Sequence, residues 1–256
     1  MPTPVVHIYI AQQVLAAGNG AAPLQALRQQ AGYFLLGSIA PDAWSVSQIT
    51  RRRSHLLPIP IPAGRRGDAE LLATYPQLER AEQLPPAQAA FVAGYMAHLL
   101  SDEIWYYRIF EPFFQREAAG DPPLPRRLLL HTALRLHCEA ELARRLEPSL
   151  ADALAGAAAP YNFPVFSDAD LQFWRDRISA EIRPGAPKRS AEVFAQRLGV
   201  PVEEMTGLLE SSDALRNQVL SRLPAGQLDQ VTEVSIAQAL KMIADYLGGP
   251  AAGART

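Results

Sequence analysis

Cysteine is almost absent, since Cys138 is the only one in 256 residues. A single cysteine excludes an intramolecular disulfide and a metal site built from several thiolates. Long apolar runs are missing as well. The two most apolar stretches, 34–44 and 87–100, contain Asp42 and His98 and fall short of the roughly 18 apolar residues that a membrane-spanning helix needs. A transmembrane segment is therefore not expected.

Lysine is the second scarce residue. Only Lys188 and Lys241 are present, so arginine supplies 24 − 2 = 22 of the basic residues. Arginine binds phosphate and carboxylate groups through paired hydrogen bonds, although a GC-rich genome produces the same excess without any function. The formal net charge is only −2. This balance gives no electrostatic reason to expect a nucleic acid or an anionic membrane as partner.

The remaining composition is that of an ordinary globular domain. Hydrophobic residues make up 48% and charged residues 20% of the chain, which argues against a disordered tether. The first ten residues, MPTPVVHIYI, lack the basic segment, apolar run and small-residue cleavage site of a secretory signal. We therefore expect a cytoplasmic protein; its oligomeric state does not follow from the sequence.

Helical periodicity dominates the chain, and alternating β-branched residues are scarce, so we predict an all-α, single-domain multi-helix bundle. Start signals include Ser167, with Asp170 three residues later. The predicted helices span 5–17, 23–39, 67–82, 86–117, 124–147, 149–158, 168–183, 190–198, 201–210, 212–223 and 230–247.

Two irregular segments divide the predicted helices. Residues 55–67 contain three prolines and two glycines, and 159–166 contain two more prolines, so both should be extended. All five histidines precede residue 138. We therefore expect a metal-binding helical core over 1–158 and a C-terminal helical extension over 159–256 that packs on the same domain.

The most informative pair is His98 and Asp102, which stand four residues apart in FVAGYMAHLLSDEIWYYRIF. This spacing places both side chains on one face of a helix, within an apolar stripe. A buried imidazole and carboxylate are costly unless they are paired or coordinate an ion. The pair therefore predicts either a hydrogen-bonded core pair or half of a metal site.

A second pair, His137 and Glu141, repeats this spacing in LLLHTALRLHCEAELARR. An ordinary ion pair on the surface of a helix has the same four-residue spacing. Two such pairs on neighbouring helices nevertheless favour a shared polar centre. His131 precedes His137 by six residues and is expected to face elsewhere.

Three further candidates are His7 at the start of the first helix, Asp42 after FLLGSIAP, and His55 at the start of the proline-rich loop. Each alone would pass as a structural residue. Zinc and similar divalent metals bind imidazole nitrogen and carboxylate oxygen, and a site for several metals needs five or six such ligands from separate elements. The chain offers enough of them.

In this order, the residues resemble the zinc-dependent phospholipase C family, whose wider relatives include fungal single-strand nucleases. The resemblance covers roughly residues 5–145. The matching pieces are an early histidine (His7), FLLGSIAPD ending at Asp42, a histidine shortly after it (His55), GYMAHLLSD with His98 and Asp102, and HCEAE with His137 and Glu141.

The resemblance implies the all-α bundle of that family and up to three zinc ions. It implies one zinc site formed by Asp42, His55, His98 and Asp102. Asp102 would bridge to a second metal that His7 binds, and His137 with Glu141 would belong to a third site. Family members usually carry another histidine shortly after the aspartate of the H-x-x-x-D pair, where this chain reads EIWYYRIF. The third site therefore lacks one ligand.

The implied function is zinc-dependent hydrolysis of a phosphodiester, such as a phospholipid head group or another small phosphodiester. Asp42 resembles the carboxylate that serves relatives as ligand or general base. Trp105 and Tyr106, together with Tyr107, would line the substrate entrance unless they belong to the core.

Two alternatives stay open. One is a degenerate, non-catalytic relative that keeps a structural metal and serves as a helical binding or scaffold protein, and the other is a helical protein without any metal. Other classes fit poorly, because the chain has no His-Asp dipeptide, no H-E-x-x-H motif, no E-x-x-H pair and no Gly-rich phosphate loop.

Overall fold

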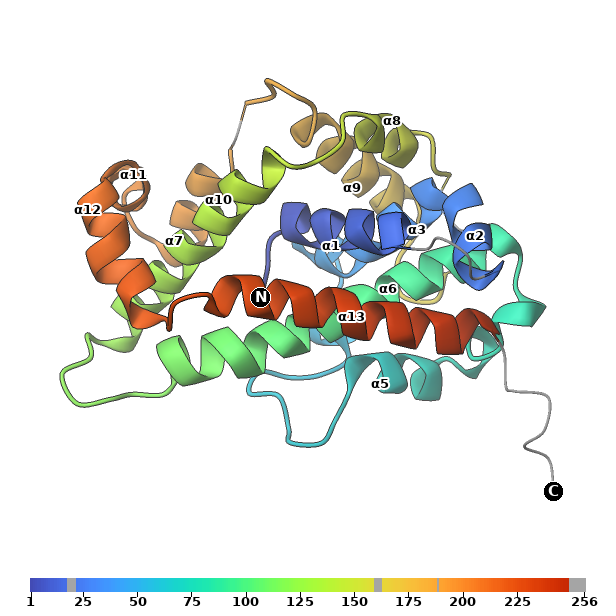
Figure 1. The fold of residues 1–256 in the computed structure, drawn as a ribbon, viewed down its shortest axis with the longest axis horizontal. Coiled ribbons are helices and arrows are strands. Elements are labelled where there is room, and N and C mark those ends of the chain that lie inside the picture. Colours follow the sequence, from blue (N-terminus) through green and yellow to red (C-terminus); the bar gives the residue numbers. More distant parts are fainter. Residues whose placement is uncertain (18–21, 159–162, 188, 249–256) are drawn as a thin grey trace.

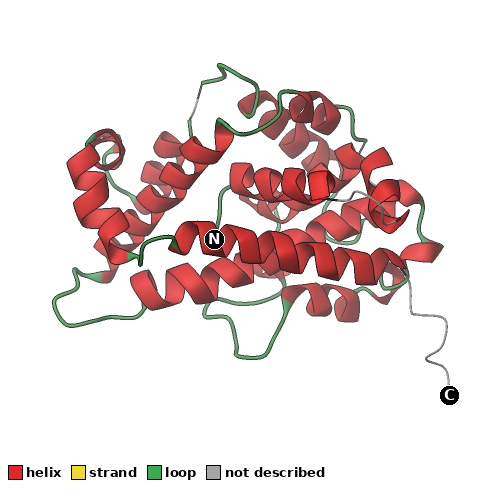
Figure 2. Cartoon of the chain, in the orientation of Figure 1, coloured by secondary structure: helices red, strands yellow, loops and turns green. Residues whose placement is uncertain are grey.

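The computed structural model describes residues 1–17, 22–158, 163–187 and 189–248, and all regular structure in these ranges is helical (Figure 2). This confirms the all-α prediction. The α-helices are α1 (Pro4–Ala17), α2 (Ala22–Gln29), α3 (Ala31–Ile39), α4 (Arg51–His55), α5 (Gly67–Thr74), α6 (Pro86–Trp105), α7 (Leu124–Ala143), α8 (Ser149–Ala155), α9 (Asp168–Glu181), α10 (Ser190–Leu198), α11 (Val202–Glu210), α12 (Ser212–Ala214) and α13 (Gln227–Gly248).

Several predicted helices are shorter or divided. The predicted helix 23–39 is two helices, because the backbone at Gln30 leaves the helical region with φ −114° and ψ 28°. The predicted helix 67–82 ends at Thr74, and Pro76 then begins a 3₁₀ turn. The long helix 86–117 changes to π geometry over Tyr106–Gln115, with Pro112 inside it. Of the predicted irregular segment 159–166, residues 159–162 lie outside the described part of the chain.

Helix α6 forms the centre of the fold. Every residue from Ala89 to Trp105 is buried, as expected for a helix that is covered on all sides. Helices α1, α3, α5 and α13 pack against it, and Figure 1 shows α13 lying along α6 in the long direction of the molecule. The polar residues of α6 are therefore held in the interior.

Helix α3 contacts α6 at backbone distance, through Gly37 on α3 and Gly94 on α6. A Cβ atom on Gly37 would collide with the carbonyl oxygen of Phe91, and one on Gly94 with the carbonyl oxygen of Phe34. Only glycine permits so close a crossing. Both glycines belong to the sequence pieces that carry the family resemblance, G-S-I-A-P-D and G-Y-M-A-H.

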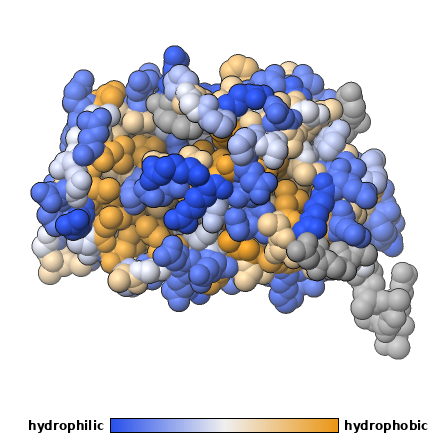
Figure 3. Space-filling view, turned by 45° about the horizontal axis from the view of Figure 1, so that its top comes forward, coloured by the Kyte–Doolittle hydropathy of each residue, from blue (hydrophilic) through white to orange (hydrophobic). Residues whose placement is uncertain are grey.

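The C-terminal helices pack on the same core as the N-terminal ones. Trp174 of α9 donates its indole N–H to the carbonyl oxygen of Ile39 at 2.8 Å, and Tyr246 of α13 donates its hydroxyl to the carbonyl of Leu78 at 2.8 Å. Within the described ranges, none of the helices is both long and apolar enough to span a bilayer. On the face shown in Figure 3, hydrophobic residues gather in areas surrounded by hydrophilic ones.

Cys138 is buried on α7, and burial raises the pKa of its thiol to about 12. Because only the thiolate reacts, we expect dithionitrobenzoate to modify the folded protein at pH 8 at least about a hundredfold more slowly than the protein in guanidinium chloride. Absorbance of the released thionitrobenzoate measures both rates. Equal rates would mean that α7 does not cover this thiol.

Candidate metal centre

Five of the predicted site residues converge in the interior. His7 comes from α1, Asp42 from the 3₁₀ helix η1 (Ala40–Ser45), His55 from α4, and His98 with Asp102 from α6. Candidate ligand atoms of two overlapping groups, His7–Asp42–His98 and His55–His98–Asp102, lie within 4.8 Å of one another. The three histidines and Asp102 are at most 4% exposed. Buried histidine and aspartate groups that could hold a metal ion are thus present.

Local sequence explains how each segment places its ligand. Thr50 caps the first turn of α4 by accepting from the backbone N–H of Arg53. The helix ends after one turn because Leu56 takes a left-handed conformation with φ 64°, which leaves His55 on the last helical position. Pro41 starts η1 and brings Asp42 just beyond the end of α3.

The imidazole of His98 is oriented by the backbone. Its Nδ1 lies 2.8 Å from the carbonyl oxygen of Ser38. A carbonyl only accepts, so Nδ1 carries the proton, and Nε2 keeps a free lone pair. An imidazole whose second N–H is held by a carbonyl is the usual arrangement of a metal-binding histidine.

Serine hydroxyls orient the other two imidazoles. Nδ1 of His7 lies 3.1 Å from Oγ of Ser101, and Nδ1 of His55 lies 2.8 Å from Oγ of Ser54. Each hydroxyl already donates its hydrogen to a backbone carbonyl, that of Ala97 for Ser101 and that of Arg51 for Ser54. The serines therefore accept from Nδ1–H. In all three histidines Nδ1 is bound within the fold, and Nε2 is the ring nitrogen that faces the shared space.

Charge in this space is negative. Burial alone would raise the pKa of Asp102, but its contact with His7 and the nearby imidazoles of His98 and His55 outweigh burial and lower it. Burial likewise opposes ionisation of Asp42, yet its contact with His55 keeps the pKa of this carboxyl below the ordinary range. Burial lowers the pKa of His98 to about 3. At neutral pH the centre thus combines a neutral imidazole at His98 with two carboxylates.

The atoms around the shared space fit a divalent cation. Nε2 of His7 and Oδ1 of Asp102 are buried without a hydrogen-bond partner among the described residues and lie 3.5 Å apart. The Nε2 atoms of His98 and His55 face each other at 3.4 Å, and Nε2 of His55 is 3.5 Å from Oδ2 of Asp102. Two imidazole nitrogens at this distance avoid repulsion when a proton or a metal cation lies between them.

The spacing of these atoms supports the same conclusion. Ligand atoms about 2.1 Å from a zinc ion at the corners of a tetrahedron lie about 3.4 Å from one another. The Nε2 atom of His55 is 3.6 Å from Oδ1 of Asp42, close to that value. The residue types and this distance therefore fit a metal of this size and ligand preference.

Arg51 is a partner of the centre that the sequence did not indicate. Its NH2 lies 3.2 Å from Oδ2 of Asp102, and its side chain is 25% exposed. The guanidinium offsets part of the negative charge. Arg51 lies four residues before His55 in the chain, but no spacing rule connects it with Asp102.

The structure does not bring His137 and Glu141 into this cluster. They line another cavity, between α7 and the start of α13, and Glu141 forms an exposed ion pair with Arg144. Within the described ranges, no third histidine, cysteine or carboxylate joins them in a group that could hold a metal. The third site implied by the resemblance thus has two ligands here.

The predicted entrance aromatics are interior residues. Trp105 and Tyr106 are 4% and 2% exposed, and the indole N–H of Trp105 donates to Nε2 of His131 at 2.9 Å. His131 faces this aromatic group and not the cluster, as its position on the helix predicts. Neither Trp105 nor Tyr106 lines the pocket beside the cluster.

A pocket of about 310 Å³ reaches the cluster from the surface. Asp42 and His55 form part of its wall, and the side chain of Asp42 is 22% exposed, so this carboxylate lies at the boundary between the buried centre and the pocket. Helices α9 and α10 of the C-terminal extension supply much of the rest of the wall, including Trp174 and Phe194. The extension therefore belongs to the site, which the sequence did not predict.

No protein-family model matches this chain, and no curated protein and no solved structure is found to be similar to it.

Proposed function

We propose that the protein is a metal-dependent hydrolase that acts on a phosphodiester, with zinc as its metal. The observation that carries the proposal is the convergence of three buried imidazoles and two carboxylates on one space beside a pocket. That set matches the ligand preference of zinc. The order of these residues, which resembles the zinc-dependent phospholipases C, supports the reaction type.

His98 would hold the metal together with His55 and Asp102 or with His7 and Asp42, and Asp42 also lies at the side of the pocket. A bound divalent ion would supply Lewis acidity toward a phosphoryl oxygen and acidify a water molecule. In the hydrolysis, the water oxygen bonds to phosphorus and one P–O ester bond breaks, giving a phosphomonoester and an alcohol that takes up a proton.

The chain's own residues would orient and balance the charges of this reaction. Asp42 stays ionised, because its pKa is lowered, so it is suited to accept a hydrogen bond from the attacking water or to bind the metal. The guanidinium of Arg51 is held against Asp102 and lines the pocket. It can therefore contact a phosphoryl oxygen at the edge of the centre.

Hydrolysis of bis(4-nitrophenyl) phosphate tests the proposal. We expect activity that disappears on chelation, returns with Zn²⁺, and falls at least about a hundredfold in Asp42→Asn. Asp245→Asn, at an exposed residue of α13 that pairs with Lys241, serves as the matched control and should keep the activity. Activity that survives complete removal of metal would refute the proposal.

Deep burial of the histidines favours a second candidate, a structural metal in a helical binding protein. Only Asp42 and His55 of the cluster reach the pocket wall. A protein that binds about one metal per chain, loses stability on chelation and hydrolyses no phosphodiester would support this second function.

A further inference from the structure

Four arginines line the pocket beside the cluster: Arg51, Arg135, Arg177 and Arg197. Two of them have carboxylate partners. Arg51 pairs with Asp102 at 3.2 Å, and Arg177 pairs with Glu181 at 2.9 Å. Arg135 and Arg197 differ, because no hydrogen bond or ion pair joins either guanidinium to any residue that the structure describes.

Arg135 and Arg197 share one aromatic ring. The guanidinium carbon of Arg135 lies 4.4 Å from the ring centre of Phe194 on α10, and that of Arg197 lies 5.6 Å from the same ring and 5.9 Å from the ring of Trp44. The ring contacts orient the two guanidinium groups but leave their N–H groups available to donate hydrogen bonds. Two like charges are thus held close together.

The guanidinium of Arg135 is also poorly solvated. Its Nε is buried and has no hydrogen-bond partner among the described residues. Burial lowers the pKa of Arg135, and the nearby carboxylates Asp42, Asp102 and Glu139 only partly oppose this. A buried cation with open donors and a like-charged neighbour is unfavourable unless an anion binds there.

The glutamates of the pocket do not form ion pairs with Arg135 or Arg197. Glu139 accepts a hydrogen bond from the hydroxyl of Ser190 at 2.6 Å, and Glu181 is bonded to Arg177. Arg135 and Arg197 therefore keep their positive charge without an ion-pair partner among the described residues, in the pocket that Asp42 and His55 also line.

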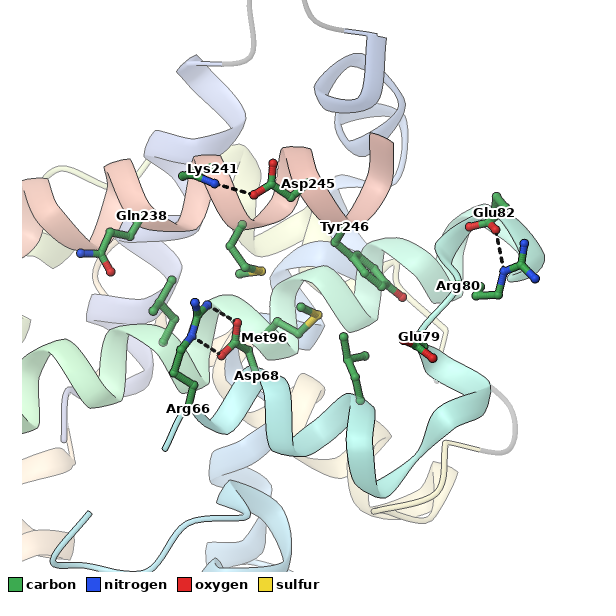
Figure 4. A pocket seen from close by; sticks show the side chains of 13 residues that line it. Arg66, Asp68, Glu79, Arg80, Glu82, Met96, Gln238, Lys241, Asp245 and Tyr246 are labelled. Atoms are coloured by element: carbon green, nitrogen blue, oxygen red, sulfur yellow. Dashed lines mark hydrogen bonds and ion pairs between the residues drawn. The ribbon is translucent and has the colours of Figure 1, made fainter. Parts of the chain in front are cut away.

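A larger cavity, of about 870 Å³, lies between α5, α6 and α13 and shows the contrast (Figure 4). Six of its seven charged side chains form ion pairs with each other, Arg66 with Asp68, Arg80 with Glu82, and Lys241 with Asp245; the seventh is the acidic Glu79. Such internally neutralised pairs do not indicate a charged ligand. In the pocket beside the candidate metal centre, by contrast, the guanidiniums of Arg135 and Arg197 have no ion-pair partner among the described residues.

We propose that Arg135 and Arg197 form an anion subsite that binds a second negatively charged group of the substrate. The substrate would then be a phosphodiester that also carries a carboxylate or a second phosphate, with its reacting phosphorus at the metal centre. This inference rests on the proposed function as far as the substrate is concerned. The subsite itself belongs to the folded chain, with or without metal.

Inorganic phosphate binding to metal-free protein tests the subsite without relying on catalysis. We expect isothermal titration calorimetry to detect one phosphate per chain, with affinity reduced about tenfold or more in Arg135→Gln and several-fold in Arg197→Gln. Arg183→Gln, at an exposed arginine that pairs with Asp152 and lies outside this pocket, is the control. Circular dichroism checks that each variant is folded; Arg197 is exposed, so its replacement should not disturb the fold.

Two matched substrates test the consequence for catalysis. In zinc-loaded protein, kcat/KM should be at least about tenfold higher for 2-carboxyethyl 4-nitrophenyl phosphate than for the isosteric 3-methylbutyl ester, and Arg135→Gln should remove this preference. Phosphate binding that depends on Arg135 without hydrolysis of any diester would keep the subsite and overturn the proposed function. Hydrolysis without preference, and phosphate affinity equal in wild type and both variants, would overturn the subsite alone.

Discussion

His98→Ala is expected to remove nearly all bound metal from the purified protein, whereas His137→Ala keeps it. His98 belongs to both candidate ligand groups, and its Nε2 is aimed at the shared space by the bond from Nδ1 to Ser38. Loss of one ligand and of its orienting bond weakens metal binding by one to several orders of magnitude. His137 stands in a different cavity. Metal analysis by inductively coupled plasma mass spectrometry, after growth with added zinc, measures both variants.

Loss of metal from His98→Ala must be distinguished from unfolding of the variant. Because His98 is fully buried, Asp102→Asn is measured beside it as a variant of nearly equal volume, and it should lose the metal too. Unchanged metal content in His98→Ala and Asp102→Asn would show that the cluster is a hydrogen-bonded core group. A loss of one equivalent in His137→Ala alone would instead assign the metal to the site implied by His137 and Glu141.

Short-range spacing explains how much of the centre the sequence could provide. His98 and Asp102 are four apart on a buried helix, and periodicity alone places them on one face. His7, Asp42 and His55 carry no such relation to each other, and only the order shared with a known family grouped them with the pair. The structure brings all five together, while the metal itself stays a prediction.

What the sequence could not provide depends on tertiary contacts. The serines that fix the tautomers lie beside a histidine in the chain, as Ser54 does, or bind one 94 residues away, as Ser101 binds His7. Arg135 faces the site only because α10 folds back on α7. Similarly, Trp105 at the end of α6 and Tyr106 at the start of the π-helical segment are buried because neighbouring elements cover them, which the local sequence pattern does not reveal.

Some helix boundaries are set by local sequence signals, and others are set by tertiary packing. Ser167 was predicted to start a helix, and its side chain accepts from the backbone N–H of Asp170 as a cap should. The break at Gln30 has no such signal, since no proline or glycine stands there. There the packing of α3 on α6 and α8 decides the direction of the chain, and local propensity does not.

Gly94→Ala is expected to destabilise the protein by about 2–4 kcal/mol and to release the metal. The added Cβ would collide with the carbonyl of Phe34 and press on the backbone N of Ser38, so α3 would have to move away from α6. That movement would withdraw the carbonyl of Ser38 from Nδ1 of His98, freeing the imidazole to rotate. Urea unfolding of metal-free protein measures the first effect, and metal analysis measures the second.

Gly207→Ala is the matched control for this substitution. Gly207 lies within α11, and no atom is within 4 Å of the Cβ it would gain. Because alanine favours helix over glycine by up to about 1 kcal/mol, this variant should be as stable as the wild type or more so, with its metal content unchanged. If Gly94→Ala behaved like Gly207→Ala, the close crossing of α3 and α6 would not be what orients His98. Gly94 of the sequence piece G-Y-M-A-H would then have no part in building the centre.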